Sequence, residues 1–415
     1  MIPLKIAVNS LKSNKIRTTL TVLGIIIGIA VVIIVMSAGE GLKKLILDQV
    51  EAFGSDIIQV EIKVPATAHA SAENAMGQAM GIQITTMTLE DGEAIEKLPN
   101  VKNHYVWLMG QEVVSYLDQN RSTNIIGTLP SFIEVDQSTI ESGRFFTKEE
   151  NDNLARVAVL GYKMAEKLFG GADPLGNDIK IGNLKFKIVG VLEERGATFG
   201  MDIFDDVVYL PVKSLQKLLM GIDHVQAITV QIHDQSIEEE TAEDIRYLLR
   251  ERRDTTDPDK DDFGVMSMTE AREMIDVIFN GITLLLIAIA GISLLVGGIG
   301  IMNIMYVSVS ERTFEIGLRK ALGAKKNNIL WQFLAEAVIL TLIGGILGIA
   351  LGIIVSYLIG VIAGLLGLDW SFVLPPSSII IAFGFCGFVG LVFGYYPARK
   401  AAKMDPIIAL KHEKL

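Results

Sequence analysis

The chain has 415 residues, of which 50% are hydrophobic and 20% are charged. It is too apolar for an ordinary soluble protein and too charged to lie wholly within a membrane. Its single cysteine, Cys386, excludes a disulfide framework and a cysteine-based metal site. The composition therefore indicates a membrane protein with a large domain outside the lipid.

Four apolar runs are long enough to cross a bilayer, since a spanning helix needs about 20 apolar residues. They are Leu20–Ala38, Phe279–Tyr306, Ile329–Leu351 and Ile379–Tyr396. Apolar residues at helical spacing continue the first run to Gly54, so we expect a stalk that leaves the membrane as a helix. A cleaved signal peptide is the alternative for this run, but a signal core has only about 7–15 apolar residues.

The charges are distributed unevenly along the chain. The N-terminal segment, the turn after the second run and the C-terminal tail together carry 14 of the 37 Lys and Arg residues and four acidic residues. The block Gly39–Ile278 carries 23 basic and 42 acidic residues. Because short basic loops remain in the cytoplasm, we expect both termini inside and the acidic block outside.

At the N-terminus, Ile2–Asn14 has the pattern of an amphipathic helix with Lys5 and Lys12 near its apolar face. Such a helix lies in the lipid headgroup layer. The alternative is that these lysines only set the orientation of the first span.

The large block between the first two spans mixes strand and helix patterns. Asp56–Val64 alternates as a strand, Pro65–Ile82 has no clear period and is predicted as a loop, and Thr88 is placed to cap a helix Leu89–Leu98 with Asp91. Ile57–Gly127 and Asp223–Met268 are predicted as two halves of an α/β domain, with a mainly β subdomain between them. The fold class is therefore four transmembrane helices with a large α/β domain between the first and second.

The resulting division of the chain has eleven parts. They are a cytoplasmic amphipathic helix (1–15), the first span and stalk (16–54), the first α/β half (55–128), the inserted β subdomain (129–221), the second α/β half (222–268), the second stalk and span (269–306), a cytoplasmic helix (307–328), the third span (329–360), an outer turn (361–377), the fourth span (378–396) and a cytoplasmic tail (397–415).

A polar segment, Met305–Ala324, separates the second and third spans. From Thr313 its apolar residues follow helical spacing, and Gly323 is placed to end that helix. A short helix across the cytoplasmic mouth of two spans is suited to docking another protein. Nearby, Glu336 is an ionisable residue well inside a span. It is either a proton or substrate site, or a structural residue that snorkels to the interface or pairs with Arg319 or Lys320.

Glycines recur four residues apart in the spans, as in Gly344, Gly348 and Gly352. This spacing lets helix backbones approach closely in lipid, so we expect tight helix packing and no aqueous pore.

The 415 residues contain no P-loop, no H-E-x-x-H pair and no G-x-S-x-G elbow. We therefore expect no enzymatic chemistry and no cofactor on these residues, and no recognition of nucleic acid.

Three stretches resemble one known family. NIMYVSVSERTFEIGLRKALGAKKNNILWQFLAEA from Asn303 is similar to the segment after the second span of MacB-type ABC permeases, a group that includes lipoprotein-release and FtsX-like proteins. YYPARKAA from Tyr395, with DPIIAL from Asp405, resembles their closing motif. The stretch from Val157 to Leu192 resembles their inserted subdomain, and the start SLKSNKIRTTLTVLGIIIGIAVVI is also similar.

This resemblance implies a homodimer in the cell membrane with a separate P-loop ATPase subunit in the cytoplasm. That ATPase would bind ATP and magnesium, and an accessory protein could join outside. The implied coupling residues are Ser310, Glu311, Arg312, Glu315, Ile316, Arg319, Lys320, Ala321, Leu322, Gly323 and Ala324. The implied closing motif comprises Pro397, Ala398, Ala401, Ala402, Asp405, Pro406, Ala409 and Leu410.

Two functions follow from the resemblance. The first is the permease of a transporter that exports or extracts an amphipathic cargo, such as a peptide, drug, lipid or lipoprotein. The second is an FtsX-like regulator that does not transport and that switches an external cell-wall hydrolase. A secondary transporter ranks below both, because it would require polar residues near the midplane and internal repeats.

Overall fold

A computed structural model describes residues 15–51, 54, 56–68, 72–196, 202–366, 368 and 370–411. The amphipathic helix predicted at Ile2–Asn14 lies outside these residues. The chain divides into two compact units, one formed by the residues up to Leu45 and from Ile275, and the other by Ile46–Met274. We call the first the membrane unit and the second the α/β domain.

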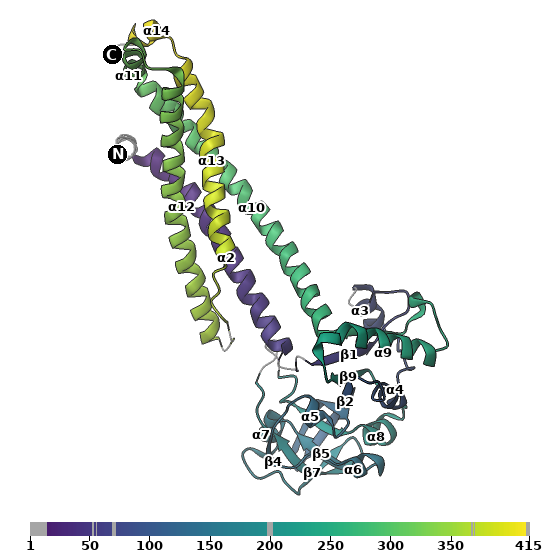
Figure 1. Cartoon of the computed structure of the whole chain (residues 1–415). Coiled ribbons are helices and arrows are strands. Elements are labelled where there is room, and N and C mark those ends of the chain that lie inside the picture. The colour runs from purple at the N-terminus through teal and green to yellow at the C-terminus, as the bar shows by residue number, and fades with distance from the viewer. Residues whose placement is uncertain are drawn as a thin grey trace. The chain divides into compact units, whose positions relative to one another are not determined.

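Four of the helices are long and apolar enough to cross a membrane, within the part of the chain that the structure describes. They are α2 (Lys15–Glu51), α10 (Met268–Glu311), α12 (Lys326–Leu365) and α13 (Pro376–Lys403), and two short helices, α11 (Thr313–Ala321) and α14 (Pro406–Lys411), complete the membrane unit (Figure 1). Helix α10 has 44 residues. At 1.5 Å per residue it is about 66 Å long, more than twice the thickness of a bilayer core.

Several glycines of the membrane helices lie at close contacts, as their spacing predicted. A Cβ on Gly348 of α12 would lie 2.8 Å from the Ile26 carbonyl oxygen of α2. A Cβ on Gly24 of α2 would lie 3.5 Å from the Cα of Gly297 in α10. Side chains from all four long helices meet in one buried apolar cluster. The small residues thus allow the helix backbones to touch.

The described residues of the α/β domain form ten strands and several short helices. The strands are β1 (Ile57–Ile62), β2 (Val101–Tyr116), β3 (Gln119–Thr128), β4 (Ile140–Gly143), β5 (Val157–Leu160), β6 (Asp178–Ile181), β7 (Leu184–Leu192), β8 (Val207–Pro211), β9 (Ala227–Ile232) and β10 (Phe263–Ser267). The α-helices are α3 (Ala72–Ala79), α4 (Leu89–Ile95), α5 (Phe132–Val135), α6 (Lys148–Asp152), α7 (Tyr162–Phe169), α8 (Val212–Ser214) and α9 (Glu238–Arg252). Leu215–Met220 forms a π-helix, and Gln235–Ile237 and Pro258–Lys260 form 3₁₀ turns.

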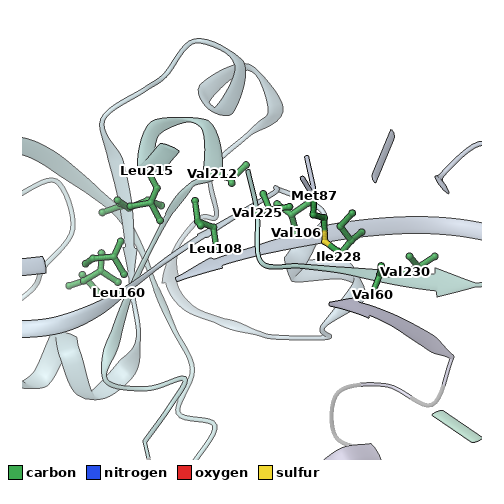
Figure 2. Close-up of a cluster of buried hydrophobic side chains, with 14 of the residues drawn as sticks. Val60, Met87, Val106, Leu108, Leu160, Val212, Leu215, Val225, Ile228 and Val230 are labelled. Carbon is green, nitrogen blue, oxygen red and sulfur yellow. The ribbon is translucent and has the colours of Figure 1, made fainter. Parts of the chain in front are cut away.

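The strands run in the order β10-β1-β9-β2-β3-β8-β5-β7-β4, and β6 pairs with β2 and β7. The long strand β2 joins the two parts of this order. Its first half, to Trp107, pairs with β9, and its second half, from Leu108, pairs with β3. One buried core extends along the sheet, with Val60, Val106 and Leu160 among its members (Figure 2).

The structure confirms the α/β fold class and differs from the prediction in detail. Helix α3 lies within Pro65–Ile82, which was predicted as a loop because its Ala, Gly and Met residues show no helical period. The β2–β3 hairpin pairs with β9 on one side and with β8 on the other. The subdomain boundaries at 128 and 221 stay predictions.

Asp91 links α4 to α9 inside the domain. Its carboxylate accepts hydrogen bonds from the Thr88 backbone N–H at 3.0 Å, from Arg252 at 2.6 Å and from Arg253 at 2.8 Å. The capping role predicted for Thr88 and Asp91 is confirmed. Burial acts to raise the pKa of Asp91, but the hydrogen bonds from Arg253, Thr88 and Arg252 outweigh it and hold that pKa below its ordinary value.

Candidate functional site

The candidate site is formed by α11 together with the C-terminal residues Pro397–Leu410. We call these residues the α11–α14 unit. Helix α10 ends at Glu311, and α11 begins at Thr313, whose hydroxyl donates to the carbonyl oxygens of Val309 at 3.2 Å and Ser310 at 2.8 Å. These bonds use carbonyls that the end of α10 leaves without a helical partner. The turn between the two helices is thereby fixed by local hydrogen bonds.

Helix α11 ends where the sequence predicted. Gly323 has a φ of +92°, a left-handed conformation that glycine adopts without strain. Its N–H donates to the Lys320 carbonyl oxygen at 3.1 Å, and the Ala324 N–H donates to the Arg319 carbonyl oxygen at 3.0 Å. The chain then reverses directly into α12.

Arg312 ties the junction of α10 and α11 to α12. Its guanidinium donates to both carboxylate oxygens of Glu336, at 3.3 and 3.1 Å. The predicted structural role of Glu336 is thus supported, but its predicted partners, Arg319 and Lys320, are wrong. Helix α11 turns away after Arg312, so those two side chains reach other groups.

Arg319 and Lys320 connect α11 to its surroundings by different bonds. Arg319 donates to Gln332 Oε1 of α12 at 2.7 Å and pairs with Glu315 one turn earlier on α11. Lys320 Nζ donates to the carbonyl oxygens of Ala402, at 3.0 Å, and Met404. A cation on the last carbonyls of α13 is favourable because the C-terminal end of a helix carries partial negative charge.

The closing motif packs directly on α11. A Cβ on Gly317 would lie 2.8 Å from the Cβ of Ala409, which is fully buried. Asp405 begins α14 by accepting a hydrogen bond from the Ile407 N–H at 2.8 Å. The motif's small residues are buried: Pro397, Ala398, Ala401, Ala402 and Ala409. Two stretches about 80 residues apart in the sequence therefore form one packed unit.

The predicted coupling residues occupy different environments. Ser310, Glu311, Glu315, Ala321, Leu322 and Gly323 are exposed, Arg312, Arg319, Lys320 and Ala324 are half-buried, and Ile316 is buried. In the closing motif, Asp405 is exposed, and Pro406 and Leu410 are half-buried.

Several large apolar side chains of this unit are exposed. The exposed fractions are 50% for Phe314 and 45% for Leu318 on α11, 81% for Leu322 directly after α11, and 69% for Ile407 and 62% for Ile408 on α14. These residues lie beyond the apolar runs that span the membrane, next to basic side chains. Exposed apolar residues grouped in this way are typical of a surface that contacts another protein or lipid.

Sequence reasoning missed part of this unit. Gly317, Phe314, Leu318, Gln332 and Ile407 were not among the predicted site residues. A glycine inside a helical pattern signals close packing, so Gly317 could have been found from the sequence. The partnership of Gln332 with Arg319 depends on the angle between α11 and α12, which no local pattern gives.

Comparisons with known proteins identify both units of the chain. Residues 18–248 match the MacB-like periplasmic core domain, and residues 287–406 match the FtsX-like permease C-terminal family. The periplasmic region of MacB from Actinobacillus actinomycetemcomitans aligns with 56% of this chain and 97% of its own, with a TM-score of 0.46 and 17% identity.

Curated relatives match almost the whole chain. The macrolide export ATP-binding/permease protein MacB of Bdellovibrio bacteriovorus is 38% identical over 97% of this chain and 60% of its own length. The pyoverdine export ATP-binding/permease protein PvdT of Pseudomonas syringae pv. syringae is 38% identical over 96% of this chain and 58% of its own. The chain thus spans about 60% of the length of these relatives. With a MacB-like core domain over more than half of its residues and an FtsX-like segment after it, the chain belongs to the MacB-like permease family.

Proposed function

We propose that this chain is the permease subunit of an ABC transporter. In this proposal a separate P-loop ATPase subunit binds ATP and magnesium and docks on the α11–α14 unit. Nucleotide-driven movement of the ATPase shifts α11, and the long helices α2 and α10 transmit that movement. The cargo is an amphipathic molecule that is exported or extracted on the side of the α/β domain.

The α11–α14 unit is the observation that carries this proposal. Its exposed apolar residues are suited to contact with a partner protein. The relatives are named ATP-binding/permease proteins, and this chain covers only about 60% of their length. The part of the relatives that this chain does not cover is large enough for an ATPase domain. The fixed attachments of α11, through Arg312 to α12 and through Lys320 to α13, suit a helix that transfers force.

The charge distribution supports the proposed orientation. The α11 region and the C-terminal tail are basic, whereas the block that contains the α/β domain carries 42 acidic and 23 basic residues. By the positive-inside rule, α11 and both termini lie in the cytoplasm of a cell membrane and the α/β domain lies outside. We further propose a homodimer, because two ATPase subunits act as a pair and each needs a docking helix.

Complex formation tests this function. The full chain is co-expressed with the ABC ATPase subunits of its source cell and purified, and any captured P-loop protein is identified. Leu322→Asp places a charge on the exposed face of α11 and is expected to reduce capture at least tenfold. The matched control is Leu117→Asp, since Leu117 is 85% exposed on the β2–β3 turn.

Capture of a P-loop ATPase by the unmodified chain and by the Leu117 variant, but not by the Leu322 variant, would support the proposal. Equal capture by both variants would refute docking at α11. The regulatory alternative would replace transport under a different outcome. In that outcome the complex forms, and deletion of the chain changes the activity of an external hydrolase but leaves the export of every tested cargo unchanged.

A further inference from the structure

His104 is a histidine enclosed in the α/β domain. It lies on β2, two residues before Val106, and so points to the same face of the sheet as that core residue. Its side chain is only 6% exposed. Buried ring nitrogens ordinarily have hydrogen-bond partners, so the surroundings of the two nitrogens decide what this residue does.

Neither ring nitrogen of His104 has a hydrogen-bond partner among the described residues. Nε2 lies against α4, because a Cβ on Gly92 would come within 2.7 Å of it. The missing side chain at Gly92 is what allows the helix backbone to rest on the ring. Nδ1 lies 3.2 Å from a carboxylate oxygen of Glu96, directly after α4, but without the alignment of a hydrogen bond. A buried imidazole with two unpartnered nitrogens is rare in folded proteins.

Protonation of the ring changes its contact with α4. The neutral imidazole has one N–H, whereas the imidazolium has two and a positive charge. Nδ1–H can then pair with Glu96, but Nε2–H meets the helix at Gly92, where the described residues offer it no acceptor. A charged N–H without an acceptor is costly to bury. That cost is relieved when α4 lifts and water reaches Nε2.

The groups around the ring act on its charge in opposite directions. Burial disfavours the imidazolium and is the largest effect, so the pKa of His104 lies below its ordinary value of 6.5, against the attraction of Glu96 and Glu93. Strand β9 presents the apolar Val230 to His104. The two arginines at the end of α9 that reach α4 are bound to Asp91. At neutral pH the ring is therefore uncharged and α4 can rest on it.

Helix α4 is connected to the start of α10 through α9. Asp91 of α4 accepts hydrogen bonds from Arg252 and Arg253 at one end of α9. At the other end of α9, the Glu238 carboxylate accepts a hydrogen bond from the Met268 N–H at 2.7 Å. Met268 is the first residue of α10. A displacement of α4 thus acts on a helix that is bound to the start of α10.

We propose that His104 is an acid-sensitive switch, in which protonation of the ring releases α4 from β2. The lowered pKa fixes the sign: the closed form is most stable above about pH 6.5, and its stability falls as the pH drops below that value. His104, α4 and α9 all belong to the α/β domain, so the switch requires no ATPase at α11.

Hydrogen exchange of the α4 amides tests the proposal in the full chain, in nanodiscs, between about pH 7.5 and about pH 5.5. Measured rates are divided by the intrinsic exchange rates, so that they report the opening of α4. When opening exposes a histidine, it becomes up to about tenfold more favourable for each pH unit below 6.5. We expect about threefold or greater opening at the lower pH. Asp91 titrates below this range, since its pKa lies under 3.8.

Three variants identify the group responsible. His104→Leu has no proton to bind and should abolish the pH dependence of α4 opening. The matched control is His233→Leu, because His233 is exposed directly after β9, and this variant should keep the full pH dependence. Glu96→Gln removes a carboxylate that favours the imidazolium, so the increase in opening should move to lower pH.

Nuclear magnetic resonance of the unmodified chain, labelled with carbon-13 in its histidines, gives a measurement that does not require His104→Leu to fold. The His104 signal, recognised by its shift in Glu96→Gln, should titrate below pH 6.5. Titration at or above pH 6.5 would overturn the proposal. So would an α4 opening that does not change with pH, or an equal pH dependence in His104→Leu and the unmodified chain.

Discussion

Arg312 and Glu336 form an ion pair between the end of α10 and α12, in which the Glu336 side chain is 4% exposed and the Arg312 side chain is 21% exposed. The pair joins the chain segment that precedes α11 to the helix that follows it. A movement of α11 must therefore either carry α12 with it or break this pair. The pair thus connects α11 to both α10 and α12.

Removal of one partner of this pair should lower the free energy of unfolding more than removal of both partners. Glu336→Ala removes the carboxylate that the half-buried Arg312 guanidinium contacts and is expected to lower the free energy of unfolding by about 1.5–3 kcal/mol, the range for a hydrogen bond to a charged group. The double variant Arg312→Met with Glu336→Leu should recover most of that loss, because no charge then remains buried. Thermal unfolding in nanodiscs measures both variants. A double variant that is less stable than Glu336→Ala would contradict a pairing role.

Gly317 is predicted to be essential for the attachment of α14 to α11. The Cβ of Ala409 lies only 2.8 Å from the position that a Cβ on Gly317 would take, so Gly317→Val would push α14 away. We expect about tenfold weaker ATPase docking, equivalent to about 1.4 kcal/mol. The control is Gly364→Val on α12, because a Cβ there meets no atom within 4 Å. Similar docking by both variants would show that the attachment of α14 to α11 is not needed for ATPase docking.

Gly348 is predicted to set the distance between α2 and α12. Gly348→Leu would bring side-chain atoms against Ile26 and Ile29 of α2, and overpacking of this kind costs about 1–3 kcal/mol. The comparison variant is Gly384→Leu on α13, where a Cβ meets nothing within 4 Å. Thermal unfolding in nanodiscs should distinguish them, and equal stability would show that this contact contributes little.

Asp91 is predicted to stabilise the α/β domain in a pH-dependent manner. Its folded-state pKa lies below the ordinary value, so its contribution is complete above about pH 4 and is lost as the pH falls through the folded-state pKa. Asp91→Asn should lower the stability of the α4–α9 region by about 1.5–3 kcal/mol at pH 7, since hydrogen bonds to a charged group are lost. The difference between the two proteins should shrink below about pH 4.

Hydrogen exchange of the α4 and α9 amides in the full chain measures this effect. Glu251→Gln, an exposed change on α9, is the control and should leave exchange unaltered. A constant difference between Asp91→Asn and the unmodified chain down to about pH 3 would contradict the assigned cause.

Much of the architecture could be predicted because it depends on local composition. The four spans follow from apolar length, and the end of α11 follows from Gly323, whose left-handed conformation disfavours other residues. The α/β class follows from the alternation of strand and helix patterns. The role of the closing motif came from resemblance alone, and the structure adds a physical reason: Ala401 and Ala409 are fully buried where larger side chains would not fit.

Other features depend on distant pairing, which the sequence does not reveal. Arg319 and Lys320 were expected at Glu336, but the turn at Arg312 directs them to Gln332 and to the end of α13. Glu61, Ala227 and Trp107 are paired side by side on β1, β9 and β2, and this register is fixed only in the folded sheet.

The most direct test of the account is a photocrosslink from position 322 of the full chain in membranes of its source cell. A photoreactive amino acid at Leu322 is expected to give an adduct with a P-loop ATPase, and the same amino acid at Leu117, similarly exposed on the α/β domain, is expected to give none. An ATPase adduct at 117, or a fully crosslinkable position 322 that captures no ATPase, would contradict the claim that α11 receives the force of ATP hydrolysis.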